Sequence, residues 1–229
     1  MMYSDRMHAG QVMAGMLERE KADIDIVVSL MRGAVPISVI IAERMNAKLL
    51  LLPVRKIGPV ENEEFAIACL TENIIENNPN VLITAKDSVI VETLGSKVLD
   101  ERKKINRMKE YIISHIGDNA NSLFDYSVMN MKKVLLVDDG IATGTSMLCA
   151  LSECRSHGPM QVSIATPVSS KESLEMFAER DINVYCPFVP QEFMAVGQFY
   201  ERFSQVSEDQ IISVVRSFME RRKGNTNKV

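Results

Sequence analysis

The sequence predicts an α/β fold in which a central, mainly parallel and twisted sheet carries helices on both faces. Two observations lead to this prediction. Short apolar runs at 23–30, 48–54 and 134–137 are rich in Val, Ile and Leu, as strands buried on both faces are. Helical patterns at 36–46 and 147–156 follow the first and third of these runs, so strands and helices alternate along the chain. Such alternation is typical of a parallel sheet with helical crossovers.

The other elements of the sheet layer follow from the same periodicities. Apolar residues at helical spacing predict an N-terminal helix over 3–21. Pro36 falls in the first turn of the helix at 36–46, where its missing N–H is harmless. Beyond residue 160 we expect a strand at 161–166, a helix at 171–180, a strand at 182–186, an irregular aromatic segment at 187–205, a helix at 208–222 and a frayed end at 223–229.

The alternation of strands and helices breaks between residues 57 and 132. Two short strands are expected there, over 65–75 and 81–84, around the turn-forming Asn77–Asn80, followed by a helix over 87–116. Because this segment is too long for a plain connection, we interpret it as an insertion standing over the carboxyl edge of the sheet. The sequence thus predicts one domain over 1–229, with an insertion at 57–132 and a C-terminal, hood-like segment at 187–222.

Composition restricts the class of protein. The net charge of −4 and the pI near 5.5 argue against general binding of nucleic acid. The four cysteines form no C-x-x-C pair and have no histidine at zinc-site spacing, so we expect reduced thiols, with Cys149 facing the core. No apolar run reaches about 18 residues and no signal-peptide core is present, so we expect a cytoplasmic protein without a membrane partner.

The stretch from Val134 to Ser146 carries the strongest chemical signal. Its apolar strand ends at Asp138 and Asp139, and a small, hydroxyl-rich loop then leads into a helix. In open α/β sheets, ligands bind beyond the carboxyl ends of the strands. A loop entering a helix there directs backbone N–H groups at a ligand, which suits phosphate. The hydroxyls of Thr143, Thr145 and Ser146 add donors, and Gly144 allows close approach of an anion.

Two adjacent carboxylates repel phosphate and need a separate explanation. They fit a ligand that carries a sugar diol beside its phosphate, because carboxylates accept hydroxyl protons and hold a divalent cation directly or through water. The ligand implied is a ribose 5-phosphate group. The alternative is an ordinary strand–turn–helix connection with a solvated Asp pair, which does not explain the whole run. A Walker-type nucleotide site is excluded because no Lys follows Gly144.

This stretch resembles, over all thirteen residues, the 5-phosphoribosyl diphosphate (PRPP) binding signature of the type I phosphoribosyltransferases. Arg32-Gly33-x-Val35-Pro36, Val54-Arg55-Lys56 and Ala195-Val196-Gly197-x-Phe199-Tyr200 further resemble a poorly characterised branch of that family. Thr145 stands where the family often has Gly or Ala, and Ala34 where that branch usually has Gly. The resemblance implies that PRPP is bound by Asp138, Asp139, Gly140, Ala142, Thr143, Gly144, Thr145 and Ser146.

The resemblance also implies a reaction, the transfer of the phosphoribosyl group from PRPP to a nitrogen acceptor, by preference a nucleobase, with release of diphosphate. Arg32 and Gly33 would form the pyrophosphate loop, with a cis peptide bond next to Arg32. Arg55 and Lys56 would act on the departing diphosphate and, with Asp138 and Asp139, form the catalytic set. Mg²⁺ is the implied cofactor, held by the two aspartates directly or through water, and a homodimer is the implied assembly.

Several alternatives stay open on the sequence alone. The chain could be a non-catalytic PRPP-binding regulator, or an enzyme with an amine or sugar acceptor. The basic run Lys97–Lys109 could face phosphate, form a nucleic-acid patch or be a solvated helix face, and Arg102 and Arg107 are its residues to test. The aromatic run Phe193–Tyr200 could wall an acceptor pocket, pack in the core or contact a second subunit.

Overall fold

A five-stranded parallel sheet forms the centre of the protein. The computed structural model describes residues 2–58, 68–77 and 88–226. All strand pairings in the central sheet are parallel, as the sequence predicts. In spatial order its strands are β2 (Lys48–Pro53), β1 (Ile26–Met31), β6 (Lys133–Val137), β7 (Gln161–Ala165) and β8 (Val184–Tyr185).

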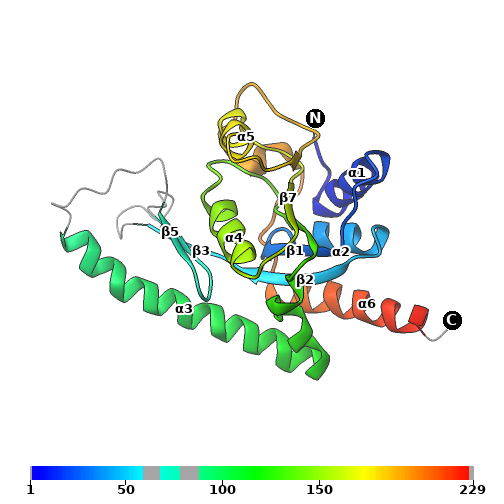
Figure 1. Ribbon diagram of the computed structural model, residues 1–229, viewed down its shortest axis with the longest axis horizontal. Coiled ribbons are helices and arrows are strands. Elements are labelled where there is room, and N and C mark those ends of the chain that lie inside the picture. The colour runs from blue at the N-terminus through cyan, green and yellow to red at the C-terminus, as the bar shows by residue number, and fades with distance from the viewer. Residues whose placement is uncertain (1, 59–67, 78–87, 227–229) are drawn as a thin grey trace.

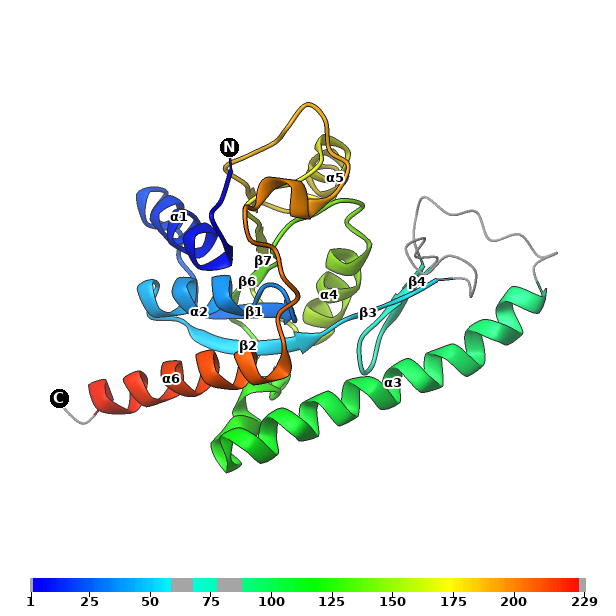
Figure 2. The same cartoon turned by 180° about the vertical axis from the view of Figure 1, so that it is seen from behind.

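Helices cover both faces of this sheet, which confirms the predicted architecture. Figures 1 and 2 show α1 and α2 on one side of the sheet and α4 and α5 on the other. Successive residues of a strand point to opposite faces, so Leu135 and Val137 pack into one apolar cluster and Leu136 into the other. The helices are α1 (Arg6–Arg19), α2 (Val35–Arg44) and α6 (Glu208–Thr226) on the first face, and α4 (Thr145–Ser156) and α5 (Lys171–Ala178) on the second.

Some helix boundaries differ from those predicted. The first helix begins at Arg6 rather than residue 3, because the Asp5 side chain accepts a hydrogen bond from the His8 N–H (2.9 Å) and caps the helix. Helix α4 begins at Thr145, two residues earlier than expected, directly after Gly144. Helix α6 continues to Thr226, so residues 223–226 are helical and not frayed.

The insertion forms a second, antiparallel sheet and a long helix. The sheet consists of β3 (Arg55–Ile57), β4 (Ala68–Leu70) and β5 (Ile75–Asn77), and α3 runs over Ser88–Ile116. The prediction of one strand over 65–75 is wrong for the described part, because Thr71 turns the chain there. Its N–H donates to the Ile74 carbonyl, and its Oγ1 accepts from the Ile74 N–H, both at 3.0 Å. The predicted strand at 81–84 and residues 65–67 lie outside the described residues.

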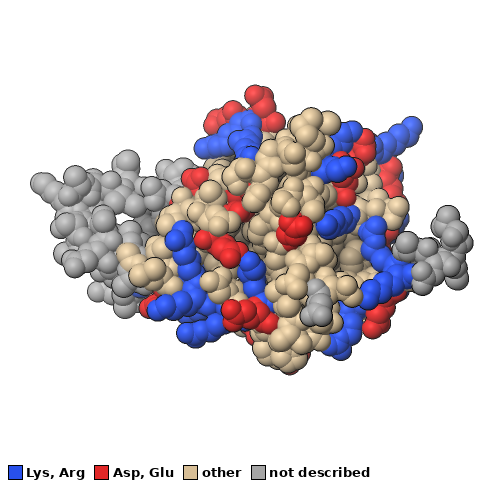
Figure 3. All heavy atoms as spheres, turned by 60° about the horizontal axis from the view of Figure 1, so that its bottom comes forward, with Lys and Arg blue, Asp and Glu red and all other residues tan. Residues whose placement is uncertain are grey.

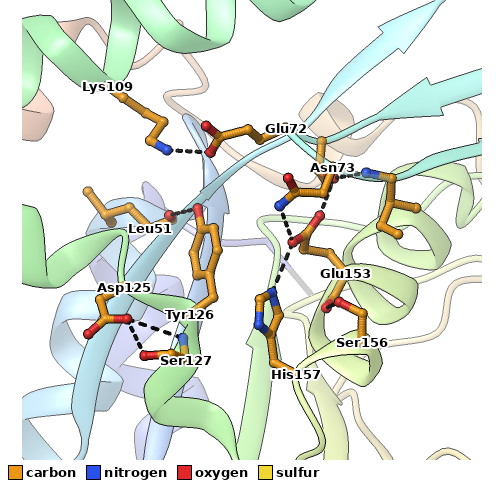
Figure 4. Close-up of polar contacts among 12 residues, drawn as sticks. Leu51, Glu72, Asn73, Lys109, Asp125, Tyr126, Ser127, Glu153, Ser156 and His157 are labelled. Carbon is orange, nitrogen blue, oxygen red and sulfur yellow. Dashed lines mark hydrogen bonds and ion pairs between the residues drawn. The ribbon is translucent and has the colours of Figure 1, made fainter.

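The β4–β5 hairpin is attached to helix α4 by a buried carboxylate (Figure 4). Glu153 of α4 is fully buried, and its oxygens accept hydrogen bonds from the hydroxyl of Thr71 and from Nδ2 of Asn73 (2.9 Å). His157 Nε2 lies 3.1 Å from the same carboxylate. Cys69 adds a contact from its Sγ to the Thr145 carbonyl, at 3.0 Å. The hairpin is thus fixed to the helix that follows the signature loop.

The chain returns from the insertion to the sheet through two 3₁₀ helices, η1 (Asp118–Leu123) and η2 (Tyr126–Met129). Their apolar residues belong to the two main clusters, and the Tyr126 hydroxyl donates to the Leu51 carbonyl at 2.8 Å. A third, η3 (Val196–Phe199), lies in the C-terminal segment. Within the described part of the chain, no helix combines the length and the apolar composition needed to cross a bilayer.

Candidate functional site

The candidate site lies where the carboxyl ends of β1 and β6 meet. These strands are neighbours, with Ser29 opposite Val137, although more than a hundred residues separate them in the chain. The chain leaves β1 toward β2 on one side, and β6 lies on the other, so a topological switch point forms between them. The turn at Arg32 and the loop at Asp138 therefore share one edge. The Met31–Arg32 peptide bond is cis, as predicted.

A cleft of about 400 Å³ opens at this edge. Arg32, Gly33, Arg55, Lys56 and both aspartates of the signature line it, so the structure brings the predicted diphosphate-binding and acidic residues together. Its other lining residues are Arg6, Leu30, Met31, Val54, Gly140, Ser146, Val196, Phe203, Gln205 and Val206.

A smaller cavity of about 70 Å³ adjoins this cleft and is lined by the signature loop from Gly140 to Met147. Asp138, Lys56 and Ser146 line both spaces. Gly144 has φ +73°, a left-handed conformation that favours glycine, and it precedes the first residue of α4. The first N–H groups of a helix have no intrahelical partner, so those of Thr145 and Ser146 are available to an anion. This geometry matches the predicted phosphate cradle.

The hydroxyls of the cradle differ in access. Thr143 is exposed and Ser146 is half-buried, but Thr145 is buried, and its Oγ1 lies 3.2 Å from that of Thr143. Thr145 nevertheless lines the small cavity with the rest of the loop. The loop is held from below, since the Ser170 and Ser173 hydroxyls donate to the Ala142 carbonyl at 2.6 and 2.8 Å.

Asp138 presents its carboxylate to both cavities. Its Oδ1 accepts a hydrogen bond from the Asp139 N–H at 2.9 Å, and Oδ2 accepts none from a described residue. Burial, followed by the charge of Asp139, raises the pKa of Asp138 well above its ordinary value. A carboxylate kept in such surroundings is typical of a functional site.

Asp139 is neutralised by an arginine from the first helix. Arg6 Nε donates to Asp139 Oδ2 at 2.8 Å, and the two side chains are only 10% and 14% exposed. Burial raises the pKa of Asp139, and the charge of Arg6 opposes that increase. The carboxylate also lies against Gly33, where a Cβ atom would be 2.1 Å from Oδ2. Only glycine at position 33 leaves room for it.

Sequence analysis missed Arg6. Its Nη1 also donates to the Ser204 carbonyl at 2.7 Å, and its guanidinium lies 3.9 Å from the Phe203 ring centroid. Arg6 therefore joins α1, the signature loop and the C-terminal segment. The signal for it was present, because Arg6 is a charged residue on the apolar stripe of α1. The buried residues of that stripe are Arg6, Ala9, Gly10, Met13, Ala14 and Leu17.

The predicted cations differ in their partners. Arg55 Nε donates to Glu101 of α3 at 2.6 Å, so this arginine is tied to the insertion while it lines the cleft. Arg32 and Lys56 form no ion pair with any residue that the structure describes. Two cations without a carboxylate partner at the end of β1 and the start of β3 suit an anionic ligand.

The C-terminal segment lines the cleft mainly with residues other than the aromatic side chains of the run 193–200. Phe199 and Tyr200 are buried in the core, and the Tyr200 hydroxyl donates to the Asp139 carbonyl at 2.6 Å. Of the run 193–200, Val196 alone lines the cleft, and its Cγ1 would lie 2.3 Å from a Cβ at Gly140. Phe203, which lies beyond that run, supplies the aromatic side chain of the cleft.

The described residues contain no cluster of three or more His, Cys, Asp or Glu that could hold a metal by itself. The four cysteines are free thiols, and Cys149 is buried as predicted.

Comparison with known proteins identifies the family. The model of the phosphoribosyl transferase domain matches residues 5–192, most of the chain. The chain belongs to the phosphoribosyl transferase domain family. This agrees with the resemblance seen in the signature stretch. The matched region contains the whole signature loop, Arg6, the turn at Arg32 and the insertion.

The named relatives agree with this family, and two solved structures are similar to this chain in fold. Two proteins from strains of Mycobacterium tuberculosis, one named "Putative phosphoribosyl transferase Rv0571c", are 29% identical over 93% of this chain. The chain spans 46% of the length of these curated relatives. The crystal structure of TT1426 from Thermus thermophilus is 30% identical, with a TM-score of 0.74 over 95% of this chain and 99% of that one. The AQ2163 protein from Aquifex aeolicus, 14% identical, shares the fold with a TM-score of 0.51 over 84% of this chain and 78% of that one.

Proposed function

We propose that this phosphoribosyl transferase domain transfers the 5-phosphoribosyl group of PRPP to a nitrogen acceptor and releases diphosphate. The observation that carries the proposal is the pair of adjoining cavities that share Asp138. One is a small cradle with helix-terminal N–H groups, and the other is a wider cleft with Arg32, Arg55 and Lys56. PRPP carries a phosphate at one end of its ribose and a diphosphate at the other. Its phosphate would therefore suit the cradle, and its diphosphate would suit the cationic cleft.

The proposed mechanism assigns each group a binding or electrostatic role. The cradle at Thr143–Ser146 holds the 5′-phosphate, and Asp138 accepts hydrogen bonds from the ribose hydroxyls. Arg32, Arg55 and Lys56 stabilise the negative charge that develops on the departing diphosphate. The transition state resembles an oxocarbenium ion, so positioning and preorganised charge supply most of the rate acceleration. Arg6 fixes the carboxylate of Asp139 and prevents it from repelling the ligand.

Magnesium is the proposed cofactor, and the residues present fit it. Asp138 offers an oxygen that no described residue occupies, and hard oxygen donors are the ligands that Mg²⁺ prefers. Mg²⁺ commonly keeps several waters and takes only one or two carboxylates plus substrate phosphates, so the lack of a complete protein cage is compatible with it. When bound, it would neutralise charge on the diphosphate. Because Arg6 already pairs with Asp139, Asp138 is the better candidate for direct contact.

A nucleobase is the proposed acceptor. Val196 and Phe203 contribute apolar surface to the cleft, against which the edge or face of a nucleobase can pack. Cytoplasmic location, which rests on the composition and cysteine pattern of the sequence, and assembly into a homodimer, which rests on the family resemblance, are further parts of the proposal.

The test is diphosphate release from PRPP and Mg²⁺ against a panel of purine and pyrimidine bases, with amines as a second panel. Turnover with one base would support the proposal that the protein is a phosphoribosyltransferase. Tight PRPP binding without turnover on both panels would favour the alternative, a regulatory protein that binds PRPP.

The matched variant for this test is Asp138→Asn. Wild-type protein at 100 times its Kd for PRPP should gain about 2.7 kcal/mol of unfolding free energy, and the variant should lose this gain. Because burial raises the pKa of Asp138, removing its charge should leave the ligand-free protein at least as stable as wild type. Asp23→Asn changes an exposed aspartate, whose side chain is 74% accessible, and should respond to PRPP as wild type does. An unchanged PRPP response in Asp138→Asn would contradict the assigned site.

A further inference from the structure

One face of the insertion helix α3 lines a cavity next to Arg32 and Arg55 of the cleft. Lys104, Arg107, Met108 and Tyr111 follow the spacing i, i+3, i+4 and i+7, which places them on a single face of a helix. These four residues line a cavity of about 350 Å³ together with Arg32, Arg55 and Glu208. The cavity therefore lies among four elements: the end of β1, the start of β3, α3 and the first residue of α6.

The cavity next to α3, called the α3 cavity below, shares lining residues with the cleft of the candidate site. Arg32 and Arg55 line both the cleft and the α3 cavity. An anion bound in one space would therefore contact cations that also face the other. The small cradle at Thr143–Ser146 shares no lining residue with the α3 cavity, so these two phosphate-compatible spaces are separate.

The α3 cavity carries an excess of positive charge. Four cations and one carboxylate, that of Glu208, line it. Glu101 offsets part of this charge, since its carboxylate pairs with Arg55 Nε at 2.6 Å and with Lys104 Nζ at 2.5 Å. Arg32 and Arg107 have no carboxylate partner among the described residues. Figure 3 shows Lys and Arg side chains on the face turned toward the viewer, with Asp and Glu side chains interspersed among them.

The walls of the cavity are held by contacts of their own. The Tyr111 hydroxyl donates to Asp209 Oδ1 at 3.1 Å, and Arg216 of α6 donates to the His115 carbonyl. Helix α3 is thus tied to α6 next to the cavity. These contacts hold the backbone of α3 beside the cavity before any ligand arrives, which lowers the ordering cost of binding.

We propose that the α3 cavity is a second anion site, which takes a multiply charged phosphate group through Arg107, Lys104, Arg32 and Arg55. A guanidinium fork binds phosphate oxygens in a bidentate manner, and two unpaired arginines suit an anion of two or more charges. The assignment of Arg32 and Arg55 to diphosphate rests on the proposed function, whereas that of Arg107 and Lys104 does not. The phosphate can come from the diphosphate of PRPP itself or from a separate phosphorylated molecule.

The experiment measures binding of inorganic diphosphate by calorimetry to the full chain and to the double variant Lys104→Gln/Arg107→Gln. Because both side chains are exposed, the fold should tolerate the change, and an unchanged Tm without ligand checks this. We expect the Kd for diphosphate to rise at least about 10-fold in the double variant. Lys103→Gln is the control: it removes one positive charge from a neighbouring residue of α3 that does not line the cavity, and it should leave Kd within about 2-fold.

A repeat titration in the presence of saturating PRPP distinguishes the two sources. If wild-type protein still binds diphosphate when PRPP is saturating, and the double variant does not, the site is assigned to a separate phosphorylated molecule. Binding abolished by PRPP, together with a higher Kd for PRPP in the double variant, assigns it to the diphosphate of PRPP.

Three results would overturn the proposal: no diphosphate binding by wild type, unchanged affinity in the double variant, or equal loss in Lys103→Gln. Failure of the proposed function is a different result. In that case PRPP would neither stabilise the protein nor turn over, while diphosphate could still bind in a manner that depends on Arg107.

Discussion

At the scale of single residues, the two adjacent aspartates of the signature have different electrostatic partners. Asp139 is paired with Arg6 and lies against Gly33, whereas Asp138 faces both cavities with one uncommitted oxygen. The sequence motif treats the two acids as equivalent. The structure separates them into a carboxylate that holds the loop in place and a carboxylate that a ligand can reach.

Gly33→Ala tests the close approach of Asp139. A Cβ at position 33 would lie 2.1 Å from Oδ2, so the carboxylate and the Arg6 pair must move. We expect the Kd for PRPP, measured by thermal shift, to rise at least about 10-fold, since misplaced groups in a preorganised site cost this much or more. Gly15→Ala is the control: the nearest atom there is the flexible end of Arg19 at 3.6 Å, and PRPP binding should not change. Wild-type affinity in Gly33→Ala would show that Asp139 is not needed in its observed position.

Arg6→Gln tests the partner of Asp139. Removing one member of a largely buried ion pair leaves an uncompensated charge, so the unfolding free energy in urea should fall by about 3 kcal/mol. Arg202→Gln removes the arginine of an exposed pair with Asp5 and should cost much less than Arg6→Gln. Adding Asp139→Asn to Arg6→Gln should restore part of the lost stability. If Arg6→Gln costs no more than Arg202→Gln, the buried pair does not stabilise the fold.

At the scale of elements, the attachment of the β4–β5 hairpin to α4 depends on Glu153. Burial acts to raise the pKa of Glu153, but hydrogen bonds from Thr71, Asn73 and His157 outweigh burial and lower its pKa below the ordinary value of 4.5. The ionised carboxylate is therefore the form that stabilises the folded protein. Because the hairpin also contacts Thr145 at the cradle, its position influences the site.

Glu153→Gln should destabilise the protein by about 2 kcal/mol at pH 7, because it weakens hydrogen bonds to a buried charge. The sign of the pH dependence follows from the lowered pKa: the contribution is present above 4.5 and is lost as pH falls through the lower pKa of the folded state. Urea unfolding at several pH values should thus show the difference between variant and wild type shrinking in acid. Glu175→Gln, on the exposed face of α5, should show no difference. A difference that grows in acid would contradict this account.

At the scale of the whole molecule, the parallel sheet is covered on both faces. Leu135 and Leu136 are adjacent in β6, are both fully buried, and belong to different apolar clusters. Leu135→Ala and Leu136→Ala should each lower the unfolding free energy by about 2–5 kcal/mol. Leu99→Ala, at a residue 60% exposed on α3, should change it by less than about 0.5 kcal/mol. A small effect at either buried leucine would mean that one face of the sheet is open.

The sequence by itself determined the features that depend on local pattern. The apolar runs predicted the parallel sheet, and the residues of the signature, of the turn at Arg32 and of the Arg55–Lys56 pair predicted the candidate site. They could do so because strand burial and the entry of a loop into a helix depend on neighbouring residues. Where local pattern was weak, the prediction failed, as at Thr71, whose side chain turns a segment that reads as one strand.

Only the tertiary structure decided which distant groups meet. Arg6 and Asp139 are 133 positions apart, Thr71 and Glu153 are 82 apart, and no local pattern links either pair. Lys104 and Arg107 line the same cavity as Arg32 because α3 packs against α6. The physical reason is that periodicity shows which face of an element is buried, whereas the packing of whole elements selects the partner that this face meets.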